Sequence, residues 1–333
     1  MKRTAKVSKY LNIGINLVIL VVSFFYIYSV FDKKTAEFSS LFENFAFIPA
    51  SQIAFFVGTL FLLMLINWGL ESLKWKNLIS PIYKISFFSA FKSILLGVFT
   101  GLFLPNRTGE WMGRIFSVPN SSKAALFVHT MIGNFAQLLT TIIMGIVALI
   151  YFSNFRSQLW QQISTIETLG GIPIKYWIAM VMALIIIIIA IMLYLNNKTK
   201  RIKESFKYLQ EISLVMYVKI FVISGFRYLV FTLQYLLMFA LFSVKIPLFD
   251  LIMLISLYFF ILAAIPSVVY TEVGIRGGVG VFLFGLYSQL QGIDEWSIAT
   301  QVILVTLIVW LVNIILPAIV GSVFLYRLKF FEK

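Results

Sequence analysis

Two short segments of the sequence carry the residue types of a buried anion site. Each contains a Glu-x-x-x-Arg pair, Glu110 with Arg114 in the first half of the chain and Glu272 with Arg276 in the second. A glutamate and an arginine four residues apart share one face of a helix, and removing one partner of a buried pair leaves an uncompensated charge. Guanidinium groups are well suited to phosphate oxygens. The two pairs are therefore predicted to lie in a substrate-binding site for an anion.

Both segments also contain residues that interrupt helices. Proline cannot donate a backbone hydrogen bond, and glycine adopts backbone geometries that other residues resist. At membrane depth such breaks are tolerated only inside protein or beside a water-filled cavity. The residues predicted to break the helices are Pro105 and Gly109 in residues 103–114, and Pro266 and Gly274 in residues 264–278.

A few further polar side chains stand in apolar surroundings. Ionisable residues within membrane segments are costly and are functional candidates for that reason. The predicted substrate-binding set comprises Arg107, Glu110, Arg114, Arg227, Glu272 and Arg276. It contains four positive and two negative side chains, which favours an anion such as a lipid phosphate. The single histidine, His129, is interpreted as a hydrogen-bonded helix residue near the membrane surface.

The composition sets the class of protein that must position these residues. Of 333 residues, 61% are hydrophobic and only 12% are charged, and the mean hydropathy is +0.97. Soluble domains carry about 25% charged residues, so a soluble enzyme is excluded. The chain has no cysteine and one histidine, so no metal site and no cofactor are predicted. The net charge of +14 indicates basic cytoplasmic loops and no nucleic-acid partner is expected.

Apolar runs give the expected membrane spans. They cover about 11–31, 48–68, 89–104, 122–150, 176–195, 213–242, 248–265, 274–290 and 297–325. A helix needs roughly 20 apolar residues to cross the bilayer. Three runs are shorter, namely 89–104, 248–265 and 274–290, and each borders one of the interrupted segments. The first run has no cleavage site after it and is interpreted as an uncleaved span.

Loop charge predicts the orientation of the spans. The N-terminus, residues 69–92, residues 196–212 and the C-terminus are basic and should be cytoplasmic. This assignment gives the two halves opposite topology, as in many secondary transporters. The predicted fold is an all-α polytopic helical bundle, with two inverted-topology halves that each contain a broken or re-entrant helix pair. The halves, about 1–150 and 176–326, form one transmembrane domain (1–333) in the cytoplasmic (inner) membrane.

The two interrupted segments resemble those of the lysylphosphatidylglycerol synthase transmembrane-region family, also called flippase-like membrane proteins. In the first segment the resemblance rests on Pro105, Arg107, Gly109, Glu110 and Arg114, with the arginine one position later than in the family pattern. In the second, Gly274 and Arg276 match, whereas Gly277 stands where the family has a glutamate. The resemblance implies lipid binding or translocation without an aminoacyltransferase domain.

The predicted function is the binding and flipping of an anionic phospholipid or lipid-linked precursor. Arg114, Arg227 and Arg276 would hold the phosphate while the lipid tails stay in the bilayer. The ion pairs could instead serve only to hold the hairpins together. A membrane glycosyl- or phospho-transferase acting on a polyprenyl lipid, and a non-transporting accessory subunit of a cell-envelope complex, are the alternative functions.

Overall fold

The computed structural model describes residues 49–102, 109–118, 121–152, 212–265, 269–292 and 295–325. Within these ranges every regular element is a helix, which confirms the all-α prediction for this part of the chain. The elements are α3 (Ala50–Ile79), α4 (Phe87–Gly101), α5 (Gly109–Phe116), α6 (Lys123–Tyr151), α10 (Leu214–Leu241), α11 (Leu248–Ala264), α12 (Val269–Gln291), α13 (Glu295–Trp310), the π-helix η2 (Leu311–Ile315) and α14 (Leu316–Ser322). The predicted spans at 11–31 and 176–195, together with Pro105, Arg107 and Pro266, lie outside the described residues.

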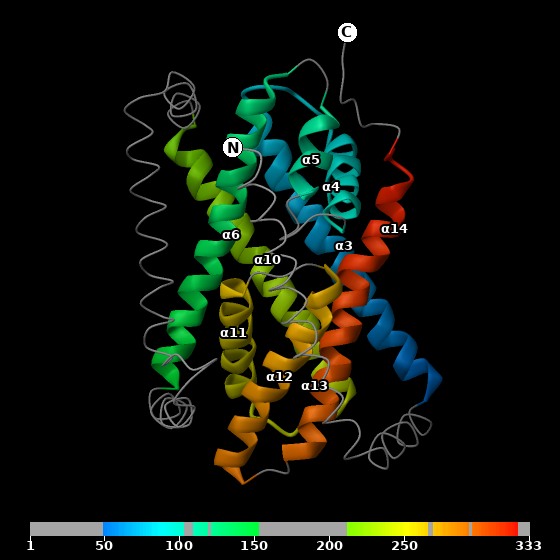
Figure 1. Cartoon of the computed structure of the whole chain (residues 1–333), viewed down its shortest axis with the longest axis vertical. Helices are drawn as coiled ribbons and strands as arrows, with labels where there is room; N and C mark the ends of the chain where they lie inside the picture. The colour runs from blue at the N-terminus through cyan, green and yellow to red at the C-terminus, as the bar shows by residue number, and fades with distance from the viewer. Residues whose placement is uncertain are drawn as a thin grey trace, which may run out of the picture.

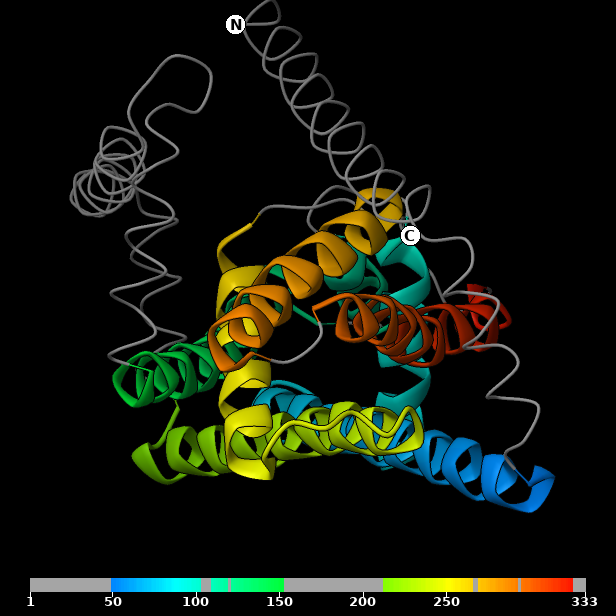
Figure 2. The same cartoon turned by 90° about the horizontal axis from the view of Figure 1, so that it is seen from below.

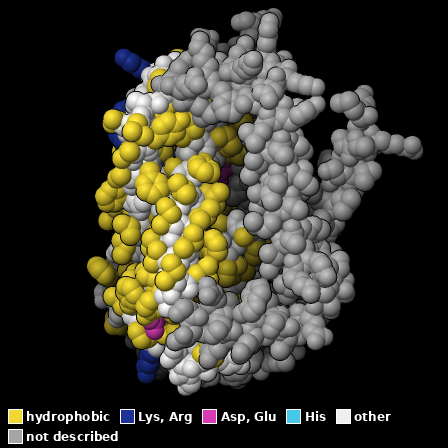
Figure 3. All heavy atoms as spheres, turned by 90° about the vertical axis from the view of Figure 1, so that its left-hand side faces the viewer, with side chains coloured by type: hydrophobic (Ala, Val, Ile, Leu, Met, Phe, Trp, Pro, Cys, Tyr) yellow, Lys and Arg dark blue, Asp and Glu magenta, His cyan; other side chains and the backbone are white. Residues whose placement is uncertain are grey.

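Five helical stretches of the described chain are long and apolar enough to cross a membrane. They are Ala50–Ile79, Lys123–Tyr151, Leu214–Leu241, Thr271–Gln291 and Ile298–Ser322. Even the shortest, with 21 residues, extends about 30 Å, the thickness of the hydrocarbon core. Large apolar side chains remain exposed along these helices, and they cover much of one side of the molecule (Figure 3). The prediction of a multi-pass α-helical membrane protein is confirmed at this level.

The helices pack against one another in pairs (Figures 1 and 2). α3 lies along α10, α11 along α6, α12 along α13, and α14 against α4. One apolar cluster is formed mainly by α10 to α13, where the rings of Phe239 and Phe284 stack 5.1 Å apart. A second cluster joins α3, α4 and α5 and contains Trp68, Trp75 and Ile94.

The short helices α4 and α5 fit closely because glycines face each other across their contact. A Cβ atom at Gly113 would lie 2.6 Å from the Cα of Gly97, and one at Gly109 would lie 2.0 Å from the carbonyl oxygen of Thr100. The Thr100 hydroxyl donates a hydrogen bond to the Gly109 carbonyl over 2.6 Å. Small residues allow membrane helices to approach closely. With 15 and 8 residues, neither helix is long enough to cross the bilayer.

The second interrupted segment differs from the prediction. α12 begins at Val269 and is continuous to Gln291, so Gly274 lies inside a helix and does not break it. The run predicted at 274–290 is therefore extended to membrane-spanning length. Glycine in a helix has a second use, which is close packing. At Gly280 in the same helix, for example, a Cβ atom would lie 2.6 Å from Val302 of α13.

The predicted end of the second span near residue 68 is wrong, because the helix extends into the basic segment 69–92. α3 continues to Ile79, and its last turns carry Glu71 and Lys74 into the interior, where both are buried. The helix continues because Trp68 and Trp75 on either side pack into the apolar core. The two charges are three residues apart and pair with each other over 2.7 Å.

Candidate functional site

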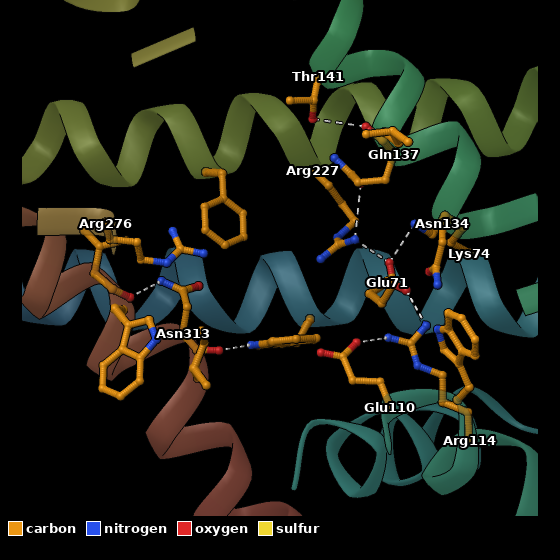
Figure 4. A pocket seen from close by; sticks show the side chains of 17 residues that line it. Glu71, Lys74, Glu110, Arg114, Asn134, Gln137, Thr141, Arg227, Arg276 and Asn313 are labelled. Carbon is orange, nitrogen blue, oxygen red and sulfur yellow. Dashed lines mark hydrogen bonds and ion pairs between the residues drawn. The ribbon is translucent and has the colours of Figure 1, made fainter. Parts of the chain in front are cut away.

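One cavity of about 410 Å³ brings together side chains from both halves of the chain. Figure 4 shows it between α3, α5, α6, α10, α12 and the α13–η2 segment, with Arg276 and Arg114 at opposite ends of the view. Its volume is in the usual range for ligand sites. The polar residues that line it are Glu71, Lys74, Glu110, Arg114, Asn134, Gln137, Thr141, Arg227, Arg276 and Asn313.

Glu71 is the centre of a buried charge cluster at one end of this cavity. Its Oε1 accepts a hydrogen bond from Arg114 Nη1 over 2.7 Å. Its Oε2 lies 2.7 Å from Lys74 Nζ and also accepts a hydrogen bond from Arg227 Nη1. Glu71 itself is only 2% exposed. One carboxylate therefore binds three cations that come from α3, α5 and α10.

Arg114 joins this cluster to α5. Besides its bond to Glu71, its Nη2 donates to Glu110 Oε2 over 3.1 Å, so the i, i+4 pair that the sequence suggests is formed. Glu110 lies in the first turn of α5 and Arg114 in its last. The eight-residue helix thus positions both side chains, and the close α4–α5 contact holds the helix.

Arg227 of α10 is held by partners from two other helices, α3 and α6. Its Nε donates to Asn67 Oδ1 over 3.0 Å, and its Nη1 donates to Gln137 Oε1 over 3.2 Å as well as to Glu71. The guanidinium carbon also lies 5.9 Å from the centre of the Trp68 ring, within the range of a cation–π contact. The Arg227 side chain is therefore held inside the protein.

Arg276 supplies a cation at the other end of the cavity. Its Nε and Nη2 both donate to Glu272 Oε1, over 2.9 and 2.5 Å. The Arg276 side chain is 20% exposed, more than those of Arg114 and Arg227. Arg276 lines the cavity, and its hydrogen bonds to Glu272 fix the orientation of its guanidinium group. The buried phenols of Tyr235 and Tyr258 lie close enough to interact electrostatically with the same guanidinium.

The π-helix η2 links the two ends of the site. Pro317 lacks an N–H group, so the Asn313 carbonyl has no ordinary α-helical donor four residues later. Trp68 Nε1 of α3 donates to that carbonyl over 3.1 Å. The Asn313 side chain in turn donates to Gln234 Oε1 of α10 over 2.9 Å. π-Helical turns are frequent at functional sites, and this one connects α3 with the second half of the chain.

The described lining of the cavity has an excess of positive charge. Lys74, Arg114, Arg227 and Arg276 line it, against the carboxylates of Glu71 and Glu110 in the lining and that of Glu272, which pairs with Arg276. Buried charges are stable only when they are paired or ligated. The cavity therefore has the chemistry of a site for an anion. Within the described residues no group of three or more histidine, cysteine, aspartate or glutamate side chains could hold a metal ion.

The structure brings together most of the residues that the sequence singled out. Glu110, Arg114, Arg227 and Arg276 line the same cavity, and Glu272 pairs with Arg276. Sequence reasoning missed Glu71 and Lys74, which were assigned to a loop; their i, i+3 spacing between tryptophans was the available signal.

His129 is a hydrogen-bonded helix residue, with Nδ1 lying 2.8 Å from the Ala125 carbonyl. It is fully buried, and it borders a space of about 10 Å³ that Glu71, Lys74 and Arg114 also line. That volume corresponds to one water molecule. His129 is therefore a neighbour of the charge cluster.

Comparison of the chain with models of protein families, with curated proteins and with solved structures gives no match.

Proposed function

We propose that the protein binds the phosphate headgroup of an anionic lipid in this cavity and moves the lipid across the membrane. The observation that carries the proposal is that three arginines, Arg114, Arg227 and Arg276, line one cavity among membrane-length helices. They come from three different helices, α5, α10 and α12. Arginine binds phosphate oxygens with a planar fork of donors.

The surroundings of the site suit a ligand that is polar at one end only. Exposed apolar side chains cover much of the described part of the face in Figure 3. Lipid tails can remain against such a surface while the headgroup enters the cavity. Burying several charges in a membrane protein is costly, and binding a charged headgroup is a function that accounts for this cost.

The proposed mechanism uses two halves of opposite topology. Residues 103–114 supply Glu110 and Arg114 at one end of the cavity, and residues 264–278 supply Glu272 and Arg276 at the other. In this proposal the two halves move relative to each other and open the cavity to each side of the membrane in turn. Each glutamate orients its arginine, and the phosphate passes between the two arginines.

A lipid-translocation assay in proteoliposomes tests the proposal. A phosphatidylglycerol with a fluorescent tail is incorporated, and a quencher that cannot cross the membrane reports how fast the inner-leaflet probe reaches the outer leaflet. We expect wild-type protein to accelerate this exchange and Arg276→Ala to abolish the acceleration. Lys84→Ala removes an exposed cation that does not line the cavity and should behave as wild type. Equal rates for wild type and Arg276→Ala in correctly folded protein would contradict the proposal.

A further inference from the structure

The cations of the charge cluster already hold an anion, and that anion is the protein's own Glu71. Arg114 donates to one of its carboxylate oxygens, and Lys74 and Arg227 contact the other. Two guanidinium groups that converge on a single small anion form a donor arrangement that suits a phosphate group. Because Glu71 also lines the cavity, a ligand in the cavity can reach the position of its carboxylate.

We infer that Glu71 occupies the phosphate position in the ligand-free protein and that a ligand phosphate must displace its carboxylate to bind. This inference rests on the proposed function and concerns the regulation of the same site. A phosphate carries more acceptor oxygens than a carboxylate and can satisfy the same two guanidinium groups. If both anions stayed in place, two negative groups would compete for one set of donors.

The contacts of the two arginines allow such an exchange without collapse of the site. When Glu71 leaves, Arg227 is still held by Asn67 over 3.0 Å and by Gln137 over 3.2 Å. Arg114 is still held by Glu110 over 3.1 Å. The two guanidinium groups therefore keep their positions for the phosphate.

Glu71 also keeps a partner after it is displaced. Lys74 lies three residues away on the same helix and pairs with Glu71 within α3. The Lys74 ammonium also donates to the Gly133 carbonyl of α6 over 3.2 Å, so it remains anchored. The carboxylate can thus release both arginines and retain its lysine, so the displaced charge is not left unpaired in the interior.

Binding measurements on Glu71→Gln test the inference. Purified full-length protein in detergent is titrated with short-chain phosphatidylglycerol and, separately, with inorganic phosphate. We expect Glu71→Gln to bind the lipid at least about tenfold more tightly than wild type, because the neutral amide competes less for the arginines. Glu71→Asp shortens the side chain and should also tighten binding; it provides a second variant if Glu71→Gln does not fold.

Glu110→Gln is the matched control, since it also removes one carboxylate from the cavity lining. Glu110 pairs with Arg114, whereas Glu71 contacts three cations, so substitution of Glu110 should tighten binding much less than Glu71→Gln. Weaker binding by Glu71→Gln than by wild type would overturn the inference, because Glu71 would then act only by orienting the arginines. That result would leave the proposed function intact, provided that Arg227→Ala also weakens binding.

The other outcomes separate the inference from the proposed function. If inorganic phosphate binds as tightly as the lipid and tightens equally in Glu71→Gln, displacement by phosphate is supported, but the lipid as its source is contradicted. If neither wild type nor Glu71→Gln binds either probe, both the inference and the proposed function fail.

Discussion

Substituting Glu71 by glutamine should destabilise the ligand-free protein more than any other single charge removal in the cavity. The change keeps the shape of the side chain but removes the carboxylate that contacts Lys74, Arg114 and Arg227 together. Breaking a buried ion pair by removing one partner costs about 3–5 kcal/mol. Since all three cations are left in the interior, we expect the free energy of unfolding to fall by at least about 3 kcal/mol.

Equilibrium unfolding in mixed micelles, followed by tryptophan fluorescence, measures this change. Glu110→Gln serves as the comparison, because Glu110 pairs with Arg114 over 3.1 Å and its side chain is 17% exposed. We expect it to lose about 1 kcal/mol. Removing Arg227 together with Glu71 should recover about 2 kcal/mol of the loss, as expected for residues in direct contact.

A loss for Glu71→Gln no larger than that for Glu110→Gln would refute the reasoning. It would mean that Glu71 is not the buried counter-charge of the cluster. A loss with no recovery in the double variant would contradict the contact between Glu71 and Arg227.

Two further predictions test how the site is positioned. Gly113→Ala places a Cβ atom 2.6 Å from the Gly97 backbone and should lower the free energy of unfolding by about 1–3 kcal/mol. A Cβ atom at Gly225 would have no atom within 4 Å, so Gly225→Ala should not destabilise the protein. Equal effects of the two substitutions would contradict the close α4–α5 contact. Trp68→Phe removes the donor to the buried Asn313 carbonyl and should lower the free energy of unfolding by about 1–3 kcal/mol; a neutral effect in the same unfolding assay would show that this bond does not stabilise α3 against η2.

Much of the membrane fold was predictable because apolar length is a property of the local sequence. The helices α3, α6 and α10 lie where long apolar runs occur. The charged pairs Glu110–Arg114 and Glu272–Arg276 were also visible, since charges are rare in such a chain and each pair lies within one helix.

Glu71 was missed because its burial depends on residues far away in the sequence. Arg114 is 43 residues and Arg227 is 156 residues from Glu71. A prediction from local charge alone ends the membrane span before Glu71 and Lys74 and places both residues in a loop. Only the assembled helices show that cations from α5 and α10 compensate this carboxylate.

The role of Gly274 was predicted wrongly because glycine has two opposite uses. It can interrupt a helix, and it can also let two helices approach closely. The sequence gives no direct means of choosing between them. In α12 the helix continues through Gly274, which is buried. The inverted relation of the two halves, which the repeated motif suggests, stays a prediction.

Mass spectrometry of the lipids that remain bound to the purified protein is the most direct test of the central claim that the cavity holds a phosphate headgroup. We predict that wild-type protein retains an anionic phospholipid or lipid phosphate, and that a variant with both Arg227→Ala and Arg276→Ala loses it while Lys84→Ala keeps it. Retention of the same anionic lipid by wild type and by the double arginine variant would contradict the account.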